Sequence, residues 1–489
     1  MIIATLPFLS QRGILGTVLR PVLSISRRIG NRSMLITAII IIATLIVDTA
    51  LAKIADLLGT QYANAEEINV KIFIVISVIA YGVGQYLILS FVRHRNKQII
   101  NSKARKKDRF MLTQKLAFVS QYVLSAILVS VILLIIFGSY FYTNQLILSN
   151  VISYSLSIFL LSLLSNRFFL WYRSSSKNLV VLSYGIACAL LTINLALGLM
   201  FMTLALLNQA SEVKPHIATS FTSFDPGSPI GILYSFTVIS GIISFLSMWV
   251  STTLLLRHHS RKLGKVKFWV MVVVPLVYFL TPFIPSFLNQ IAAPLVASDP
   301  ISAGILFTLI FSISKPAGGI LFGVAFWTVA RAVRESSIVR DYMIMTALGV
   351  VVLFVSTQGS VIAAYYPPFG LVTVSYVGLS AFMMVIGLYS SAISVSEDDR
   401  LRKTIRKNAL EESKLLENIG TAQKGQEIEN KVMQIERKVM EMAKEDAEEL
   451  EIETGVKPSL EEPDMKKYLE EVMVEVSASI KSKQPRHSS

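Results

Sequence analysis

Four polar side chains interrupt long apolar stretches of this 489-residue chain, and they have the clearest capacity for chemistry. They are Asp48, Asn194, Lys315 and Gln358. A carboxylate or ammonium in hydrocarbon is costly, so such residues are candidates for binding a solute, moving a proton or pairing with each other. At about 1.5 Å per residue from the nearest basic loop, all four lie roughly 21 to 24 Å deep. The sequence therefore predicts one intramembrane polar layer.

The segment 315–319 reads Lys-Pro-Ala-Gly-Gly and has apolar sequence on both sides. Proline removes a backbone donor and clashes with the preceding turn, and glycine weakens the helix that follows. A helix of thirty residues is also longer than the hydrocarbon core requires, so it can be interrupted. We expect a broken helix at Pro316, Gly318 and Gly319.

Two interpretations of this break remain open. In transporters, broken helices at membrane depth form substrate or ion sites, where Lys315 would attract an anionic solute and Asp48 would hold a proton. In a structural role, Pro316 makes a kink, Lys315 pairs with Asp48, and Gly319 and Gly323 form a close-packing face.

Other chemistry is not indicated by the sequence. One cysteine, Cys188, excludes a disulfide framework within the chain. The adjacent pair His258 and His259 would point in different directions on a helix, among basic neighbours. No metalloprotease, serine hydrolase or P-loop motif is present, and Asp48 is the only acid well inside an apolar stretch. We predict no enzymatic activity, no metal site and no cofactor.

The elements that must position these residues are membrane-spanning helices. Hydrophobic residues make up 53% of the chain and the mean hydropathy is +0.59. A span needs about 20 mainly apolar residues. Ten runs qualify: 34–54, 71–92, 116–138, 145–165, 178–205, 229–256, 268–286, 301–330, 342–364 and 369–395. The predicted fold is an all-α, polytopic membrane helix bundle of about ten transmembrane helices with a helical cytoplasmic tail.

Positive charge alternates along the chain and predicts its orientation. Residues 1–395 hold 29 Lys and Arg, of which 25 lie in the N-terminal arm and in four loops, at 93–115, 166–177, 257–267 and 331–341. Membranes retain basic loops on the cytoplasmic side. We therefore expect a multi-pass protein of the cell membrane with both termini cytoplasmic. Topology accounts for the basic charge, so nucleic acid is not an expected partner.

The chain divides into three predicted parts. Residues 1–33 form an amphipathic arm with five arginines, suited to the cytoplasmic membrane surface. Residues 34–395 form the ten-span transmembrane domain, and residues 396–489 form the cytoplasmic tail. The tail opens with a basic cluster suited to anionic lipid headgroups or to an ordinary positive flank: Arg400, Arg402, Lys403, Arg406 and Lys407.

The tail then changes to an amphipathic helical pattern. Its apolar residues recur at intervals of 4, 3, 4 and 3, the seam of a coiled coil: Ile428, Val432, Ile435, Val439 and Met442. A second amphipathic helix is expected at 464–480, and the residues after it are expected to be disordered. A seam of two heptads is marginal alone, so we expect it to pack on another helix, either a protein partner or a second copy in a homodimer.

These features favour a non-enzymatic membrane sensor or anchor that recruits a partner through its helical tail. A secondary transporter or permease for a small solute, using the broken eighth span, is the first alternative. The second alternative is an accessory subunit of a larger membrane complex.

Overall fold

The computed structural model describes residues 39–50, 67–100, 107–137, 143–174, 178–210, 227–257, 264–284, 300–333, 337–358, 370–397 and 414–454. The predicted arm at 1–33, the basic cluster at 400–407 and the predicted helix at 464–480 lie outside these ranges.

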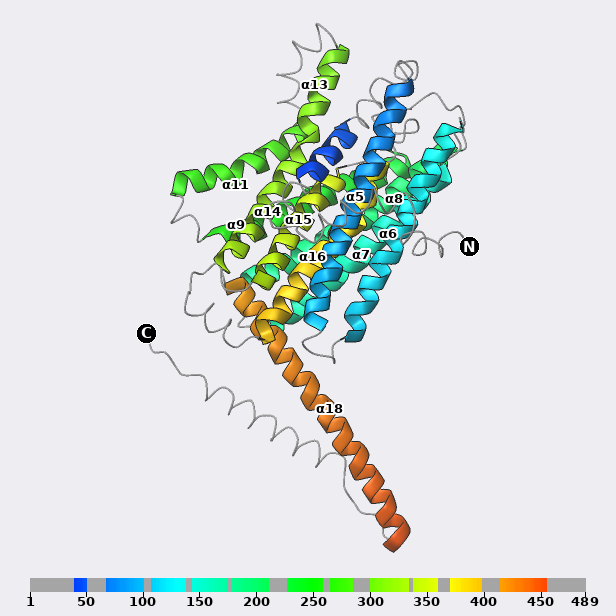
Figure 1. Ribbon diagram of the computed structural model, residues 1–489. Helices are drawn as coiled ribbons and strands as arrows, with labels where there is room; N and C mark the ends of the chain where they lie inside the picture. Colours follow the sequence, from blue (N-terminus) through cyan, green and yellow to red (C-terminus); the bar gives the residue numbers. More distant parts are fainter. Residues whose placement is uncertain are drawn as a thin grey trace. The chain divides into compact units, whose positions relative to one another are not determined.

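Every regular element in the described ranges is a helix (Figure 1). A first helix covers Ile39–Ala50. The elements that follow are α5 (Glu67–Ile100), α6 (Lys107–Ile136), α7 (Thr143–Ser174), α8 (Leu179–Ala210), α9 (Pro229–Leu256), α11 (Lys265–Leu280), the 3₁₀ turn η5 (Thr281–Phe283), α13 (Pro300–Ser312), α14 (Ser314–Ala332), α15 (Ser337–Ser356), α16 (Leu371–Glu397) and α18 (Lys414–Thr454).

Among the residues that the structure describes, eight apolar helical stretches are long enough to cross a membrane. They are Thr113–Leu134, Thr143–Ser174, Leu179–Leu207, Pro229–Leu256, Lys265–Phe283, Ile305–Arg331, Ile338–Ser356 and Leu371–Ser396. The first two predicted spans coincide with shorter apolar stretches, Ile39–Ala50 and Val75–Ser90. The prediction of an all-helical, multi-pass membrane protein is confirmed, while the count of ten crossings stays a prediction.

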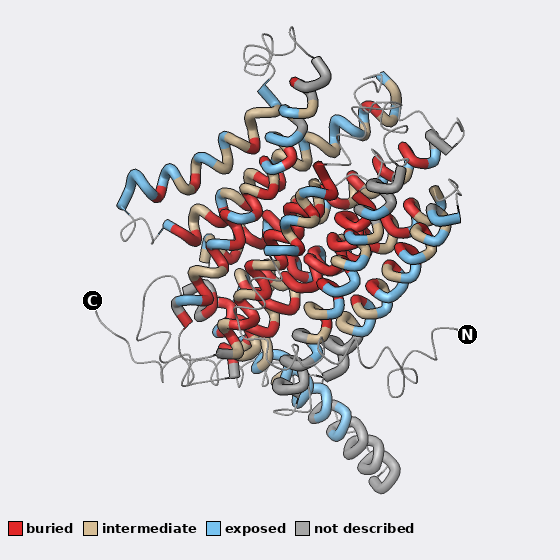
Figure 2. The backbone as a smooth tube through the Cα atoms, turned by 45° about the horizontal axis from the view of Figure 1, so that its top comes forward, coloured by how far each residue is buried: buried red, intermediate tan, exposed pale blue. Residues whose placement is uncertain are grey.

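Helices α15 and α16 form the centre of the bundle. In the α16 span 94% of the most apolar window is buried, and in α15 89%, against only 17% in α9 and in α11 (Figure 2). The exposed surface of α11 is apolar, with Val266, Val270 and Val274 each more than half exposed. Such a surface suits contact with lipid. The bundle therefore has an interior of two helices and a lipid-facing periphery.

Close backbone contacts set the register between the two central helices. A Cβ atom added to Gly349 of α15 would lie 2.9 Å from the backbone nitrogen of Met384, and one added to Gly387 of α16 would lie 2.6 Å from the carbonyl oxygen of Tyr342. The position in α15 falls as the position in α16 rises, so the helices are antiparallel. The C-terminal end of α15 consequently lies level with the N-terminal end of α16.

The remaining helices surround this pair. Helix α7 packs on α16, α8 packs between α7 and α9, and α14 packs on α15 and also contacts α9 and α11. Helices α5 and α6 contact α16 as well. Aromatic rings fill the space where α9, α11, α14 and α15 meet, because the Phe245 ring stacks on Phe279 at 3.7 Å between centroids and contacts Phe322 and Phe354.

The chain separates into two compact units, Met1–Thr421 and Ala422–Ser489. The bundle and the first residues of α18 belong to the first unit. The described part of the second unit is the rest of α18, a single helix to Thr454.

Candidate functional site

Asp48 supplies a cap to a helix far from it in the sequence. It lies in the last turn of the first helix, with 2% of its surface exposed. One carboxylate oxygen accepts a hydrogen bond from the Gly370 N–H at 3.1 Å. The other accepts from the Thr373 N–H at 3.2 Å and from the Thr373 hydroxyl at 2.6 Å. Gly370 and Thr373 flank the start of α16, so Asp48 satisfies donors that no turn of that helix can satisfy.

The backbone at Gly370 is shaped for this contact. Its φ of +85° lies in the left-handed region, which residues with a Cβ rarely adopt. Its carbonyl oxygen accepts from the Val374 N–H at 2.9 Å and so starts the helix, while its own N–H turns to Asp48. A negative charge at a helix N-terminus is also favoured by the helix dipole.

The Lys315 side chain bonds to the opposite kind of helix end, the C-terminal end of a neighbouring helix. Lys315 is the second residue of α14, and its ammonium donates to the carbonyl oxygen of Thr357 at 3.3 Å. Thr357 follows the last residue of α15, and its own N–H bonds to the Leu353 carbonyl oxygen. The ammonium therefore lies where carbonyl groups of α15 have no partner within the helix, and where the dipole favours a positive charge.

The structure thus gives Asp48 and Lys315 separate partners. The carboxylate bonds to the start of α16 and the ammonium to the end of α15. The two groups share a level because these helix ends share a level in the antiparallel pair. In hydrocarbon every backbone polar group needs a protein partner, so a polar side chain at each helix end meets that need. Direct pairing of Lys315 with Asp48, one part of the structural interpretation, is not among these described contacts.

Asn194 joins two helices at their middle. Its amide nitrogen donates to the Thr237 carbonyl oxygen at 3.0 Å and to the Ser240 hydroxyl at 2.9 Å, so α8 is tied to α9. Gln358, the fourth member of the predicted layer, lies in the turn after α15, where its N–H bonds to the Val355 carbonyl oxygen. The four residues lie in three separate places, and only Lys315 and Gln358 share one helix end.

The predicted helix break is present, a few residues earlier than Pro316. Helix α13 ends at Ser312, Ile313 forms a turn, and α14 begins at Ser314. Pro316 is then the third residue of α14, where a backbone N–H would have no partner within the helix. The Ala317 N–H bonds to the Ile313 carbonyl oxygen at 2.9 Å and continues the new helix.

The glycines after the break let neighbouring groups approach the backbone. Gly318 lies against the ring of Phe245, so that an added Cβ would overlap it. A Cβ on Gly319 would lie 2.7 Å from the Cβ of Phe354, and one on Gly323 would lie 2.9 Å from the Ala347 carbonyl oxygen. Gly319 and Gly323 thus form a small-residue face against α15, the geometry that drives helix packing without a hydrophobic effect.

Sequence reasoning missed two groups that hold α16. Thr373 carries no distinctive signal in an apolar run, yet it gives Asp48 two of its three hydrogen bonds. Ser153 of α7 belongs to a stripe with Ser149 and Ser157 that indicates close packing. Its hydroxyl donates to the Val374 carbonyl oxygen at 2.6 Å and accepts from the Gly378 N–H at 3.0 Å. Serines at four-residue spacing are a general signal of close helix packing, but the spacing does not identify the helix that they contact.

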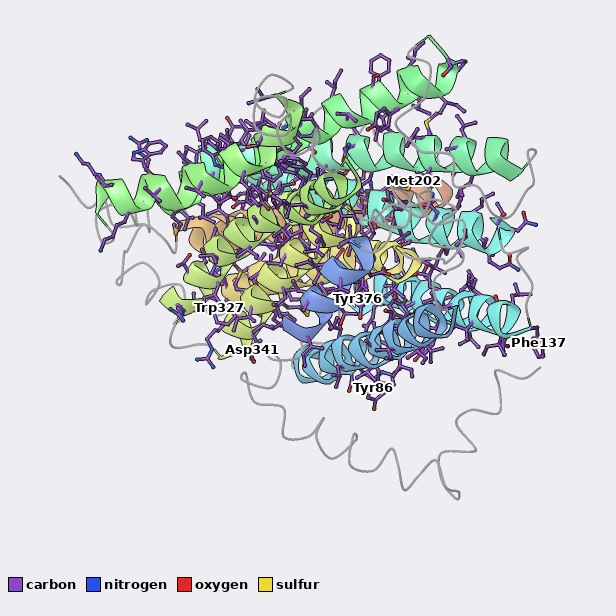
Figure 3. The ribbon with its side chains drawn as sticks, turned by 90° about the horizontal axis from the view of Figure 1, so that it is seen from above. Tyr86, Phe137, Met202, Trp327, Asp341 and Tyr376 are labelled. Atoms are coloured by element: carbon purple, nitrogen blue, oxygen red, sulfur yellow. The ribbon has the colours of Figure 1, made fainter. Side chains whose placement is uncertain are left out.

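A further polar contact lies on the α5 side of α16. The Tyr81 hydroxyl donates to the Gln121 side-chain oxygen at 2.7 Å and joins α5 to α6. The Tyr81 ring meets the Tyr376 ring edge-on at 5.0 Å between centroids (Figure 3 labels Tyr376). Asp48, Ser153 and Tyr81 therefore hold the first two turns of α16 from three neighbouring helices.

Within the described ranges, no group of three or more His, Cys, Asp and Glu side chains could hold a metal ion. Cys188 is buried in α8. The chain matches no family model and no curated protein, and its fold matches no solved structure.

The predicted seam lies on α18 within the second unit. Ile435 is 62% exposed and Met442 53% exposed, on a helix whose mean composition is polar. Ile428 is also exposed and Val432 is half-buried. Val439 follows in register on the same helix, although its side chain is not described.

Proposed function

We propose that this protein is a non-enzymatic membrane anchor or sensor that presents α18 to a protein partner on the cytoplasmic side. The observation that carries the proposal is the contrast between the bonded polar side chains of the bundle and the exposed apolar side chains of α18. The two intramembrane charges bond to the ends of core helices, whereas apolar side chains of α18 are exposed to water. Polar contacts therefore hold the helices of the membrane domain together, whereas the exposed apolar side chains of the tail are suited to binding a partner.

The geometry of the bundle supports a static role for the membrane domain. Asp48 accepts three hydrogen bonds from Gly370 and Thr373 at the start of α16. Ser153 bonds to two backbone groups of the same helix. Moving α16 relative to its neighbours would break these bonds in a medium that cannot replace them. The bundle therefore acts as a fixed support for the chain that follows α16.

The charge pattern supports the orientation within this proposal. Four basic loops and the arginine-rich arm alternate with spans, which favours cytoplasmic termini and places α18 inside the cell. The basic cluster from Arg400 to Lys407 would hold the start of the tail against anionic headgroups. Absent motifs for hydrolysis, metal binding and nucleotide binding support the absence of enzymatic activity.

The test is a paired substitution in the seam. Val432→Asp together with Val439→Asp places charge on the apolar face of α18 and should abolish binding of the tail to its partner. Binding is measured as the species that co-migrate or crosslink with the purified full-length chain, with the folded yield of the bundle as the control. If association were equal in the variant and the parent chain, the tail would have no such role.

A transporter remains the second candidate, because of one observation. Asn150 in α7 is fully buried, and neither its amide nitrogen nor its amide oxygen has a hydrogen-bond partner among the described residues. Asn150 lies one turn before Ser153, close to the level of the α16 start. An amide in that state would be expected to bind water or a small polar solute. The helix break beside Lys315 is a second feature that transporters share.

Solvent access separates the two candidates. Cys188 is first changed to Ser, and Lys315→Cys is then exposed to a water-soluble thiol reagent in membranes. The anchor proposal predicts no labelling, because a cysteine at this position, in the first turn of α14, would have no water-filled path leading to it. Rapid labelling that a solute slows would favour a wet transport path instead.

A further inference from the structure

The charged residues beside the α18 seam form a regular pattern. With Ile428, Ile435 and Met442 at d positions and Val432 and Val439 at a positions, lysine occupies successive g positions and glutamate successive e positions. The g residues are Lys424, Lys431 and Lys438, and the e residues are Glu429 and Glu436. Both sets border the apolar face directly.

The described side chains of this pattern are accessible on one helix. Glu429, Lys431 and Lys438 are exposed, as are the d residues Ile428 and Ile435. An exposed apolar stripe lined by lysine on one side and glutamate on the other is a binding surface with a defined polarity. It selects both the kind of partner helix and its direction.

The pattern fits a second copy of the same helix in parallel. In a parallel coiled coil, each g residue meets the e residue of the next heptad on the partner helix. Lys424 would then face Glu429 of the second copy, and Lys431 would face Glu436. In an antiparallel pair of copies, g meets g and e meets e, which would place lysine against lysine and glutamate against glutamate.

We propose that α18 associates in parallel with α18 of a second copy of this chain, in the register that places Ile428 on Ile428. This inference rests on the proposed function, which places α18 at the same membrane face in every copy. Copies anchored in one bilayer present their tails in the same direction, as a parallel pair requires. Confinement to the membrane raises the local concentration, so a seam of two heptads suffices where it would be marginal in solution.

The seam composition agrees with self-association. Valine at both a positions is a β-branched residue that packs well in a parallel two-stranded seam. Isoleucine at two d positions also admits a third strand, and the same g-to-e attraction operates around such a trimer. The polar residues Asp446 and Glu449, at the next a and d positions, limit the seam to its two heptads.

Single cysteines in the full-length chain test the direction. In a Cys188→Ser background, Ile428→Cys and Met442→Cys are oxidised separately in proteoliposomes. The two sites are about 21 Å apart along the helix, and a disulfide joins Cα atoms less than about 7 Å apart. Each variant therefore crosslinks to itself only if the copies are parallel and in register. Asn430→Cys, exposed on the opposite face at the same level, is the matched control.

The expected result is a disulfide-linked dimer at 428 and at 442, and about tenfold less at 430 because that site faces away from the seam. Equal crosslinking at all three sites reports random collision and overturns the proposal. Crosslinking only in a mixture of the 428 and 442 variants reports antiparallel copies and also overturns it. A link within one chain between Ile428→Cys and Ile480→Cys, without dimer, assigns the seam to the chain's own 464–480 segment and overturns it as well.

Charge reversal tests the recognition itself. Changing Lys424, Lys431 and Lys438 to Glu makes both borders acidic, and changing Glu429 and Glu436 to Lys makes both basic. Each variant alone should lose roughly tenfold or more in crosslinking at 428, because every g-to-e contact becomes repulsive. Mixing the acidic and basic variants should restore it. Unchanged crosslinking of either variant alone would remove the charge pattern as the cause.

The outcomes separate this inference from the proposed function. If Val432→Asp with Val439→Asp abolishes tail binding while no seam cysteine crosslinks to itself, α18 binds a different protein and only self-association fails. If that double variant changes no association at all, the proposed function fails with it.

Discussion

The bundle around α16 and the second unit's part of α18 use charge in opposite ways. In the bundle, single polar side chains lie at helix ends, where the buried Asp48 bonds to the α16 first turn and the half-buried Lys315 bonds to the end of α15. On α18 the charges are many and exposed, and apolar residues lie exposed between them. The difference follows from the solvent. Hydrocarbon leaves a helix end no partner except protein, whereas water satisfies both the backbone and the charges of α18.

The effect of a substitution, on folding or on association, should therefore depend on which of the two regions it falls in. A change to a buried charge in the bundle leaves several backbone groups without partners and should act on folding. A change on α18 leaves its own helix satisfied and should act on association.

The largest effect is expected from Asp48→Ala. It removes three hydrogen bonds to a charged acceptor and leaves the Gly370 and Thr373 donors buried, at a cost of about 3 to 5 kcal/mol. Folded yield in detergent and thermal melting of the purified chain measure the loss. Asp48→Asn, which keeps one acceptor oxygen and the same size, should lose roughly half as much. A variant with parental yield would mean that the α16 end is satisfied in another way.

Exchanging the two charges should not rescue the bundle. Asp48→Lys puts an ammonium at the positive end of α16, which opposes the helix dipole, and Lys315→Asp removes the donor that bonds to the Thr357 carbonyl oxygen at the end of α15. The double variant should therefore fold no better than the worse single variant. Recovery of yield in the double variant would show a direct contact between the two residues and contradict their separate partners.

A smaller loss is expected where α14 approaches α15. Gly323→Ala places a Cβ 2.9 Å from the Ala347 carbonyl oxygen and against Val351, which forces the helices apart at a cost of about 1 to 3 kcal/mol. Gly82→Ala in α5 is the matched control, because a Cβ there meets nothing within 4 Å. It should be neutral or slightly stabilising through helix propensity. Equal melting temperatures for the two variants would contradict the close approach.

Ser153→Ala should have a modest effect. It removes the hydroxyl that bonds to Val374 and Gly378 of α16, and hydrogen bonds between membrane helices contribute about 0.6 kcal/mol on average. Ser157→Ala is the control, because the Ser157 hydroxyl bonds to the Ser153 carbonyl oxygen of its own helix. Melting of the two variants side by side measures the difference, and a larger loss for Ser157→Ala would contradict the assignment.

The sequence predicted the helices and a common level for Asp48 and Lys315, but not the partners of these residues. Apolar runs report spans because each span must satisfy its own backbone in lipid. The count along a helix places Asp48 and Lys315 at one level, yet level says nothing of lateral position. Their partners are backbone groups at helix ends, which have no residue type to recognise. Gly370 and Thr373 became identifiable only once α16 had a defined first turn.

The apolar spacing on α18 can be read from the sequence because the repeat is local to one helix, and its role as a coiled-coil seam stays a prediction. Spacing of 3 and 4 depends only on helix geometry, so no tertiary information was needed to find it. The break near Pro316 was found in the same way, although the turn falls at Ile313. Proline is accepted in the first turn of a helix, so it marks the start of α14 more closely than the end of α13.

The smallest effect on folding is expected from Ile435→Asp in α18. Ile435 is 62% exposed in the chain, so the substitution buries no charge and opens no cavity in the bundle. The melting temperature of the bundle should stay within the range of a surface change, about 0.5 kcal/mol. Association through α18 should nevertheless be lost, because the aspartate would enter the centre of the seam in every copy.

The contrast with Asp48→Ala is what gives this last substitution its meaning. The Asp48 substitution should disrupt folding of the bundle, whereas the Ile435 substitution should abolish association and leave folding intact. Both readouts come from the same purified chain, melting for the bundle and crosslinking at Ile428→Cys for the tail. If Ile435→Asp also lowered the melting temperature by several degrees, α18 would stabilise the bundle itself, and the separation between a fixed support and a displayed helix would be wrong.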